Sequence, residues 1–170
     1  HDVAGGGHFS GRLTAPLCIA GGIALQALEH ALGIRIVAHI SQLGPKRVCD
    51  EPLNDMAFDP AQLAAIRSNE LPCVSAEAAL SMHEQVLSAK SELDSVGGVI
   101  ECVAYGMPAG VGDPMFDGLE NRIARIAYGI PAVKGVEFGA GFAAADMYGS
   151  QNNDPIVLDE AGHATCRTNN

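Results

Sequence analysis

The residues of this sequence that are best suited to chemistry lie in a glycine-rich segment near its beginning, residues 5–12 (GGGHFSGR). The segment leads into an apolar stretch that begins near Thr14 and that is expected to be helical. Backbone N–H groups freed by glycines, together with a helix N-terminus, favour an anion. Arg12 adds a guanidinium that can bind phosphate or carboxylate through two parallel hydrogen bonds, and Ser10 and Thr14 add hydroxyl groups. These residue types in this order indicate an anion-binding loop.

The same segment also fits a simpler interpretation, a turn before a capped helix that binds nothing. It is not a Walker A loop, because no Gly-Lys-Ser or Gly-Lys-Thr follows the glycines. It is not a dinucleotide-binding fingerprint, because the G-x-G-x-x-G spacing in a strand-to-helix context is missing. His8 could act as an acid or base near neutral pH, although a histidine beside a glycine turn is more often a hydrogen-bonding loop residue.

The other titratable residues show no spacing that is typical of a catalytic or metal site. Asp94, Glu101, Asp113 and Glu137 are scattered, and no two of them can be argued into a carboxylate pair. His39 falls within a predicted strand and is expected to be structural. The five cysteines occur singly, without a C-x-x-C pair, at positions 18, 49, 73, 102 and 166. They are expected to be reduced thiols that act as small core residues, and no metal site is expected.

The composition restricts the class of protein. Hydrophobic residues make up 48% and charged residues 18% of the 170 residues, which is typical of one globular domain over residues 1–170. The net charge of −10 argues against nucleic acid and against an anionic membrane surface as partners. No apolar run reaches the roughly 18 residues of a membrane span, and no leader peptide is expected at the start. We therefore expect a cytoplasmic protein.

The helices that must position the loop follow from apolar periodicity and capping residues. A helix is expected from Thr14, as its cap, to about Leu32, with Gly33 at its end. Gly21 and Gly22 lie in its middle at a cost of roughly 1 kcal/mol each, so another backbone is expected to pack closely there. Further helices are expected over residues 60–67, after a Ser75 cap, and from Asp117 to Pro131.

The expected strands cover residues 34–43, 97–104 and 132–138, with a short one over residues 155–158. Residues 106–114 are rich in Gly and Pro and are expected to form a loop. This order of elements predicts an α+β fold, or a mixed layered arrangement, in which helices cover antiparallel sheet.

Several segments, taken together, resemble the chorismate synthase family. Residues 7–14 (GHFSGRLT) and 20–24 (AGGIA) resemble a Ser-Ala/Gly-Arg-x-Ser/Thr signature that leads into a helix of small residues. Further resemblances follow in order at residues 94–101 (DSVGGVIE), 106–114 (GMPAGVGDP), 130–142 (IPAVKGVEFGAGF), 149–150 (GS) and 168–170 (TNN). The order and the family-like separations across nearly the whole chain make the resemblance specific.

The resemblance implies a carbon–oxygen lyase of the shikimate pathway for aromatic amino acids. Members of the family remove phosphate and a ring hydrogen from 5-enolpyruvylshikimate 3-phosphate in a 1,4-anti elimination that gives chorismate. They need reduced FMN, with NADPH as the source of electrons, although the reaction is redox-neutral; whether reduction is intrinsic or supplied by another enzyme stays open. The resemblance also implies helices sandwiched with antiparallel sheet and a homotetramer.

The resemblance assigns roles to particular residues. His8, Phe9 and Ser10 align with a flavin-contacting segment, and Pro131 and Ala132 align with a second one. Ser10 and Arg12 align with substrate-binding positions, Arg12 with the arginine that binds the substrate anion. Many members carry Asn at the position of Pro131. Proline has no side-chain amide, so that side-chain hydrogen bond is lost here and only a backbone contact can remain.

The family segments that carry proton-transfer histidines, an arginine cluster and a catalytic carboxylate are expected before residue 1 and after residue 170. We therefore expect that this chain is the central part of a longer chorismate synthase, that it holds no catalytic residue, and that it is inactive by itself. Two alternatives stay open at this point, a non-catalytic binding or assembly module that keeps the fold and an unrelated enzyme of phosphate ligands. The ordered motifs disfavour the second.

Overall fold

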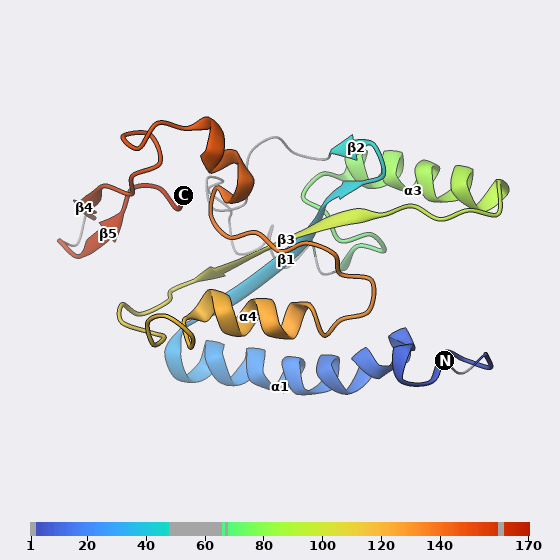
Figure 1. Ribbon diagram of the computed structural model, residues 1–170, viewed down its shortest axis with the longest axis horizontal. Coiled ribbons are helices and arrows are strands. Elements are labelled where there is room, and N and C mark those ends of the chain that lie inside the picture. The colour runs from blue at the N-terminus through green and yellow to red at the C-terminus, as the bar shows by residue number, and fades with distance from the viewer. Residues whose placement is uncertain (1–2, 48–65, 67, 160–161) are drawn as a thin grey trace. The chain divides into compact units, whose positions relative to one another are not determined.

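A computed structural model places residues 3–47, 66, 68–159 and 162–170, which together show an α+β fold (Figure 1). The chain divides into two compact units, a central unit of residues 23–107 and a flanking unit of residues 1–22 and 108–170. Helix α1 (Thr14–Leu32) begins in the flanking unit and ends in the central unit. The helix expected over residues 60–67 falls almost wholly outside the described residues.

The central unit is built on a three-stranded antiparallel sheet in the order β2-β1-β3 (Figure 1). Strands β1 (Arg35–Leu43) and β3 (Gly98–Tyr105) pair along their whole length, with one irregularity between Ile40 and Gln42. Strand β2 (Lys46–Arg47) continues β1 through a short turn at Gly44. The sequence predicted both long strands to within one residue at each end.

One face of this sheet carries the small core of the unit. Val37 and Ile66 are buried against Val74, Val103 and Tyr105. The face exists because side chains on a strand alternate, so that every second residue of β1 and β3 points to the same side. A core of this size fixes the register of β1 against β3, because a slip of one residue would turn Val37 out to water.

A histidine and a carboxylate belong to the same covered face. His39 is only 2% exposed and lies opposite Glu101 in the β1–β3 register. Its Nε2 is 3.0 Å from a Glu101 carboxylate oxygen, whereas its Nδ1 has no hydrogen-bond partner in the described part of the chain. Buried polar groups are costly unless they are paired, so this contact favours the observed register.

The cysteines only partly match the expectation that they fill the core. Cys73 is buried, but Cys18, Cys102 and Cys166 are exposed, and all four are free thiols. The pKa of the Cys102 thiol and that of the Tyr105 hydroxyl are both raised. The larger cause is partial burial, and the smaller is the negative charge of Glu101. Position 49 falls outside the described residues. The Cys102 side chain is exposed because it lies on the face of β3 that no other described element covers.

Helix α3 (Ala76–Ser91) follows its predicted start. The Ser75 hydroxyl oxygen accepts a hydrogen bond from the Ala78 N–H, as an N-cap residue does, and Met82 is the buried residue of the helix. The helix ends in a Schellman motif, in which Leu93 N–H donates to Lys90 C=O and Asp94 N–H donates to Ala89 C=O. Leu93 occupies the left-handed position of this motif with φ of 57°.

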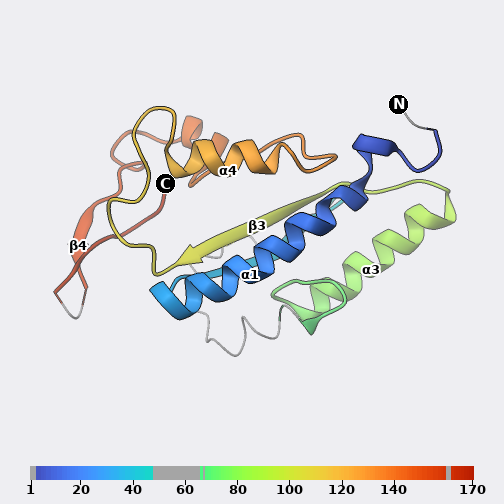
Figure 2. The same cartoon turned by 90° about the horizontal axis from the view of Figure 1, so that it is seen from below.

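Helix α1, seen along its length in Figure 2, matches its predicted range. Gly33 ends it with φ of 70°. None of its described residues is buried. The close backbone packing expected at Gly21 and Gly22 is wrong for this chain, because nothing described lies within 4 Å of a Cβ built at either glycine. The stretch Gly11–Leu32, with a hydropathy of 1.3, is long and apolar enough to cross a membrane by those two criteria alone. The sequence pattern had not predicted a stretch of this kind.

Many large apolar side chains of the described residues are exposed. They include Ile19 and Ile23 on α1 and Ile100 on β3. Apolar surface on this scale is what a chain presents when other polypeptide normally covers it.

The flanking unit contains helix α4 (Leu119–Ala127), the 3₁₀ helix η4 (Gly141–Asp146) and a hairpin of β4 (Ile156–Leu158) with β5 (Ala164–Cys166). Helix α4 is shorter than predicted at both ends, since it begins after Gly118 and stops three residues before Ile130–Pro131 turns the chain. The predicted strand over residues 132–138 is wrong. Ala132 lies in a turn, and residues 133–138 have no regular secondary structure and pair with no described strand, whereas a strand needs a partner for its backbone groups.

The last residues of the chain are held by one carboxylate. Asp154 accepts a hydrogen bond from the Thr168 hydroxyl at 2.6 Å and another from the Asn170 N–H at 3.0 Å. The Asn170 side-chain amide donates to the Gln151 carbonyl at 3.0 Å. The Thr168 hydroxyl and then the Asn170 N–H lower the pKa of the Asp154 carboxyl, because both donate to its charged form.

We expect acid to release this contact. A carboxyl whose pKa is lowered on folding stabilises the fold above its unfolded pKa and loses that effect as the pH falls through its folded pKa, here below about pH 4. In an NMR titration, the Asn170 amide proton should therefore shift with a midpoint below that of an ordinary aspartate. Thr168→Val removes the larger cause and should raise this midpoint. An Asn170 amide that does not titrate between about pH 6 and 2 would contradict the contact.

Candidate functional site

The candidate site begins with the glycine-rich loop, which the structure folds into two short 3₁₀ turns before α1. Turn η1 covers Gly7–Phe9 and turn η2 covers Gly11–Leu13. The three glycines before them all adopt positive φ, with values of 92° for Gly5, 81° for Gly6 and 52° for Gly7. Side chains disfavour these values, so the loop needs glycine here.

Ser10, and not Thr14, is the capping residue of this segment. The Ser10 hydroxyl oxygen accepts a hydrogen bond from the Arg12 N–H at 3.3 Å and so caps η2. Thr14 is already helical, and its hydroxyl donates to the Gly11 carbonyl at 2.6 Å. The expectation of a Thr14 cap is therefore wrong, because the 3₁₀ turn η2 directly precedes α1 and moves the cap back to Ser10.

Some amides in and directly after the loop are used within it. The N–H groups of Phe9, Ser10 and Leu13 donate to the carbonyls of Gly6, Gly7 and Ser10. With the Arg12 N–H donating to the Ser10 hydroxyl, four amides are already bonded. These four amides therefore do not contribute to an anion site, whereas the Arg12 side chain can.

The Arg12 guanidinium is exposed and is available for a ligand. The ion pairs between described residues join His39 to Glu101, Arg122 to Asp117 and His163 to Asp159, and none of them includes Arg12. Helix α1 also has no acidic residue in its first turn that would neutralise the positive end of its dipole. A guanidinium beside an uncompensated helix N-terminus is a suitable place for phosphate or carboxylate.

Two further side chains of the loop are typical of a site that binds a planar ligand. The apolar ring of Phe9 is 70% exposed, and His8, the neighbouring residue in η1, is also exposed. An exposed aromatic ring next to a hydroxyl and a guanidinium can stack on a ring system while the polar groups bind its substituents. This set of groups fits a flavin or another aromatic anion.

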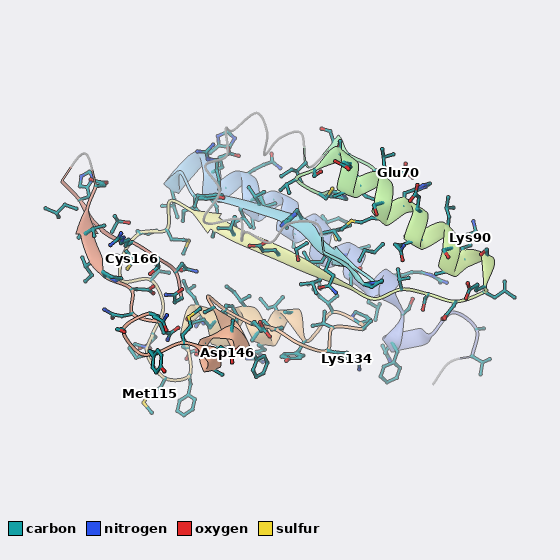
Figure 3. The ribbon with its side chains drawn as sticks, turned by 90° about the horizontal axis from the view of Figure 1, so that it is seen from above. Glu70, Lys90, Met115, Lys134, Asp146 and Cys166 are labelled. Atoms are coloured by element: carbon teal, nitrogen blue, oxygen red, sulfur yellow. The ribbon has the colours of Figure 1, made fainter. Side chains whose placement is uncertain are left out.

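The second candidate segment is a tight turn at Pro131 and Ala132. The Val133 N–H donates to the Ile130 carbonyl at 3.3 Å, and Ala132 has φ of 72°. A hydrogen bond across four residues, with Pro second and a positive φ third, is the pattern of a type II β-turn. Glycine is the usual residue at the third position, so Ala132 holds a strained backbone. Lys134 follows this turn on a segment without regular secondary structure (Figure 3).

The loop at residues 8–12 and the turn at Pro131–Ala132 belong to the same compact unit although about 120 residues separate them. The sequence predicted neither the left-handed Ala132 nor the internal bonding of the loop amides. An Ile-Pro-x-Val stretch is a recognisable turn signal, but it would have pointed to positive φ only if glycine followed the proline.

Comparison with known proteins decides the family. The family model described as chorismate synthase matches residues 1–170. This chain belongs to the chorismate synthase family. A chorismate synthase of Lancefieldella parvula is 49% identical over 164 residues, which are 91% of this chain and 42% of that protein. A chorismate synthase of Thermococcus gammatolerans is 43% identical over 170 residues, 100% of this chain and 45% of that protein.

A solved structure agrees with this family assignment. A crystal structure of chorismate synthase matches with a TM-score of 0.80 and 28% identity over 95% of this chain and 50% of that one. The predicted α+β fold and the resemblance to chorismate synthase are thus confirmed. The chain spans less than half the length of the curated relatives described above.

The strained turn generates a prediction that this chain alone can test. Ala132→Gly should raise the free energy of unfolding by up to about 1 kcal/mol, because a left-handed non-glycine residue costs more than the extra chain entropy of glycine. Ala140→Gly is the matched control, since Ala140 has φ of −68° and carries no such strain. Urea unfolding of both variants measures the difference. If both substitutions destabilise the chain equally, the turn is not strained.

Proposed function

We propose that residues 1–170 form one domain, the central part of a longer chorismate synthase, which converts 5-enolpyruvylshikimate 3-phosphate to chorismate by 1,4-anti elimination of phosphate. The observation that carries the proposal is the family match over all 170 residues. The activity requires a longer polypeptide, because the elimination needs proton-transfer groups and several cations. Arg12 is the only Lys or Arg among the first 34 residues of a chain with net charge −10.

In this proposal His8, Phe9, Ser10, Pro131 and Ala132 contact FMN. The exposed Phe9 ring, the neighbouring Ser10 hydroxyl and the tight turn at Ala132 suit a flat polar cofactor. When bound in reduced form, FMN supplies transient electron density to the eliminating substrate. The residues of this chain bind and orient, and we assign no catalytic residue among them.

Arg12, supported by Ser10, binds the substrate anion in this proposal. A guanidinium that no described carboxylate neutralises keeps its full charge for phosphate or carboxylate. The Ser10 oxygen caps η2 and so holds the backbone of Arg12 in place while its second lone pair and its proton stay available. Binding of this kind positions the leaving phosphate and keeps it away from the acidic surface of the chain.

We further propose that the complete protein is a cytoplasmic homotetramer without a nucleic-acid or membrane partner. NADPH supplies the electrons that reduce its FMN. The charge of −10 supports the absence of polyanionic partners. Helix α1, which is apolar and uncovered within this chain, would pack in the complete protein against polypeptide and not against lipid.

The first test concerns the 170-residue chain by itself. Supplied anaerobically with reduced FMN and 5-enolpyruvylshikimate 3-phosphate, it should form no measurable chorismate. Each missing acid–base group is typically worth about 10² to 10⁴ in rate, and several are absent. The control is a full-length relative under the same conditions. Chorismate formation by the 170-residue chain at a comparable rate would refute the view that catalytic groups lie outside it.

The second test concerns Arg12 in the full-length protein. Arg12→Ala should weaken substrate binding about 100-fold, and Arg12→Lys about 10-fold, because lysine keeps the charge but loses the planar fork. Arg125→Ala is the matched control, since it removes an exposed positive charge from α4 instead. Substrate affinity and kcat/KM measure the effect. If Arg12→Ala behaves like Arg125→Ala, Arg12 is a surface residue and the anion site lies elsewhere.

A further inference from the structure

Gly139 packs directly on the backbone of Asn169 and Asn170, within the flanking unit. A Cβ built on Gly139 would overlap with the Asn170 carbonyl carbon, and it would lie 2.6 Å from the Asn170 oxygen and 3.1 Å from the Asn169 oxygen. The obstacle is backbone, which cannot move aside as the end of a flexible side chain can. Gly139 also has φ of 57°, which residues with a side chain rarely adopt. Two separate constraints therefore require glycine at this position.

The backbone that Gly139 contacts is held by one carboxylate oxygen. Asp154 Oδ1 accepts hydrogen bonds from both the Thr168 hydroxyl and the Asn170 N–H, at 2.6 Å and 3.0 Å. The Asn170 side-chain amide adds a third bond, to the Gln151 carbonyl at 3.0 Å. Hydrogen bonds to an ionised acceptor are stronger than those between neutral groups. Residues 168–170 are thus a fixed support for Gly139.

The segment before Gly139 is held by hydrogen bonds only at its two ends. It begins at the tight turn of residues 130–133, which we call the flavin turn, and it ends where the Gly141 N–H donates to the Phe138 carbonyl at 3.0 Å. Between these turns, residues 134–137 make no backbone–backbone hydrogen bond and pair with no strand in the described part of the chain. The contact of Gly139 with residues 169–170 is therefore the next fixed point of the chain after the flavin turn.

The flavin turn depends on such support because its backbone is strained. Ala132 has φ of 72° although it is not glycine. A strained conformation of this kind persists only where the surrounding structure holds it. The hydrogen bond that closes the turn is 3.3 Å long, which is weak support by itself. Gly139 follows Ala132 by only seven residues, so a displacement at Gly139 is passed to the turn along a short stretch without regular bonds.

We propose that Asp154 and Gly139 are positioning residues for the flavin turn: Asp154 fixes residues 168–170, and the close contact of Gly139 with them fixes the segment that begins with the turn. The proposal rests on the proposed FMN contact of Pro131 and Ala132. Neither Asp154 nor Gly139 contacts the flavin in this scheme. Both act only through the backbone between them and the turn.

The first experiment uses the full-length protein and compares Asp154→Ala with Asp159→Ala. Asp159 is the matched control, because its carboxylate also accepts a backbone N–H, that of His163 at 2.8 Å, at the opposite end of the β4–β5 hairpin. Both variants lose a carboxylate and should lose thermal stability. Only Asp154→Ala should raise the Kd for FMN, by about 10-fold, as measured by fluorescence titration. Equal values of Kd in the two variants overturn the proposal.

Asp154→Asn tests whether the shared oxygen is what matters. An asparagine places its own Oδ1 where Asp154 Oδ1 accepts both hydrogen bonds, so it can keep both without the charge. Asp154→Asn should therefore retain most of the FMN affinity that Asp154→Ala loses. A loss as large as that of Asp154→Ala would mean that the charge acts on the flavin directly, and the positioning role would be wrong.

Gly139→Ala tests the other side of the same contact, with Gly162→Ala as its control. Both glycines have positive φ, but nothing described lies within 4 Å of a Cβ built on Gly162. Gly139→Ala should raise the Kd for FMN as Asp154→Ala does, whereas Gly162→Ala should only lower stability. Because both residues act through one contact, the Asp154→Ala/Gly139→Ala double variant should bind FMN about as well as either single variant. Full additivity of the two effects contradicts a shared contact.

Hydrogen–deuterium exchange of residues 130–141 in the full-length protein separates this proposal from the proposed function. The amides of Val133 and Gly141 should exchange faster in Asp154→Ala, but not in Asp159→Ala. Unchanged exchange shows that Asp154 does not hold this segment, and the proposal is wrong while the FMN site can stand. Faster exchange with an unchanged Kd for FMN shows that the turn does not bind the flavin, so the proposed FMN contact fails and the positioning role with it.

Discussion

The antiparallel pairing of β1 with β3 is the interaction on which the described core depends. It joins residues such as His39 and Glu101 that are 62 positions apart in the sequence. One side of the two strands collects Val37, Val103 and Tyr105 around the buried Ile66. Since the polar pair lies on that same side, one register satisfies both apolar burial and hydrogen bonding, and a shifted register would satisfy neither.

The other side of the same pair of strands is apolar and largely open. The register places Ile36 opposite Ala104, Ala38 opposite Cys102, and Ile40 opposite Ile100. These six residues are apolar or weakly polar, yet several of them are exposed, and the same holds for α1. A sheet with one covered and one open apolar face, in a chain that spans less than half of its relatives' length, has the surface chemistry of the inner part of a larger protein.

Helix bounds depend on neighbouring residues and were predicted well from the sequence. Strand pairing depends on residues far apart and was not. Apolar periodicity and Gly33 gave the bounds of α1, and a serine before an acidic first turn gave the start of α3. Residues 132–138 have strand-like composition but no partner, and pairing cannot be read from one segment. The candidate site divides in the same way. Residue types suggested Arg12 and Ser10, whereas the strain at Ala132 depends on a backbone angle that the sequence leaves open.

The distance in sequence between the two long strands also sets an order of events during synthesis. Helix α1 needs only neighbouring residues to form, so it can be complete soon after it leaves the ribosome. Strand β1 has to wait for 62 further residues before Glu101 can reach His39, which at translation speed is roughly 3 to 12 seconds. Throughout that interval a nascent chain displays an apolar helix and an unpaired strand edge. The edge of β1 that β3 later covers therefore stays unpaired for far longer than any helix of the chain needs to form.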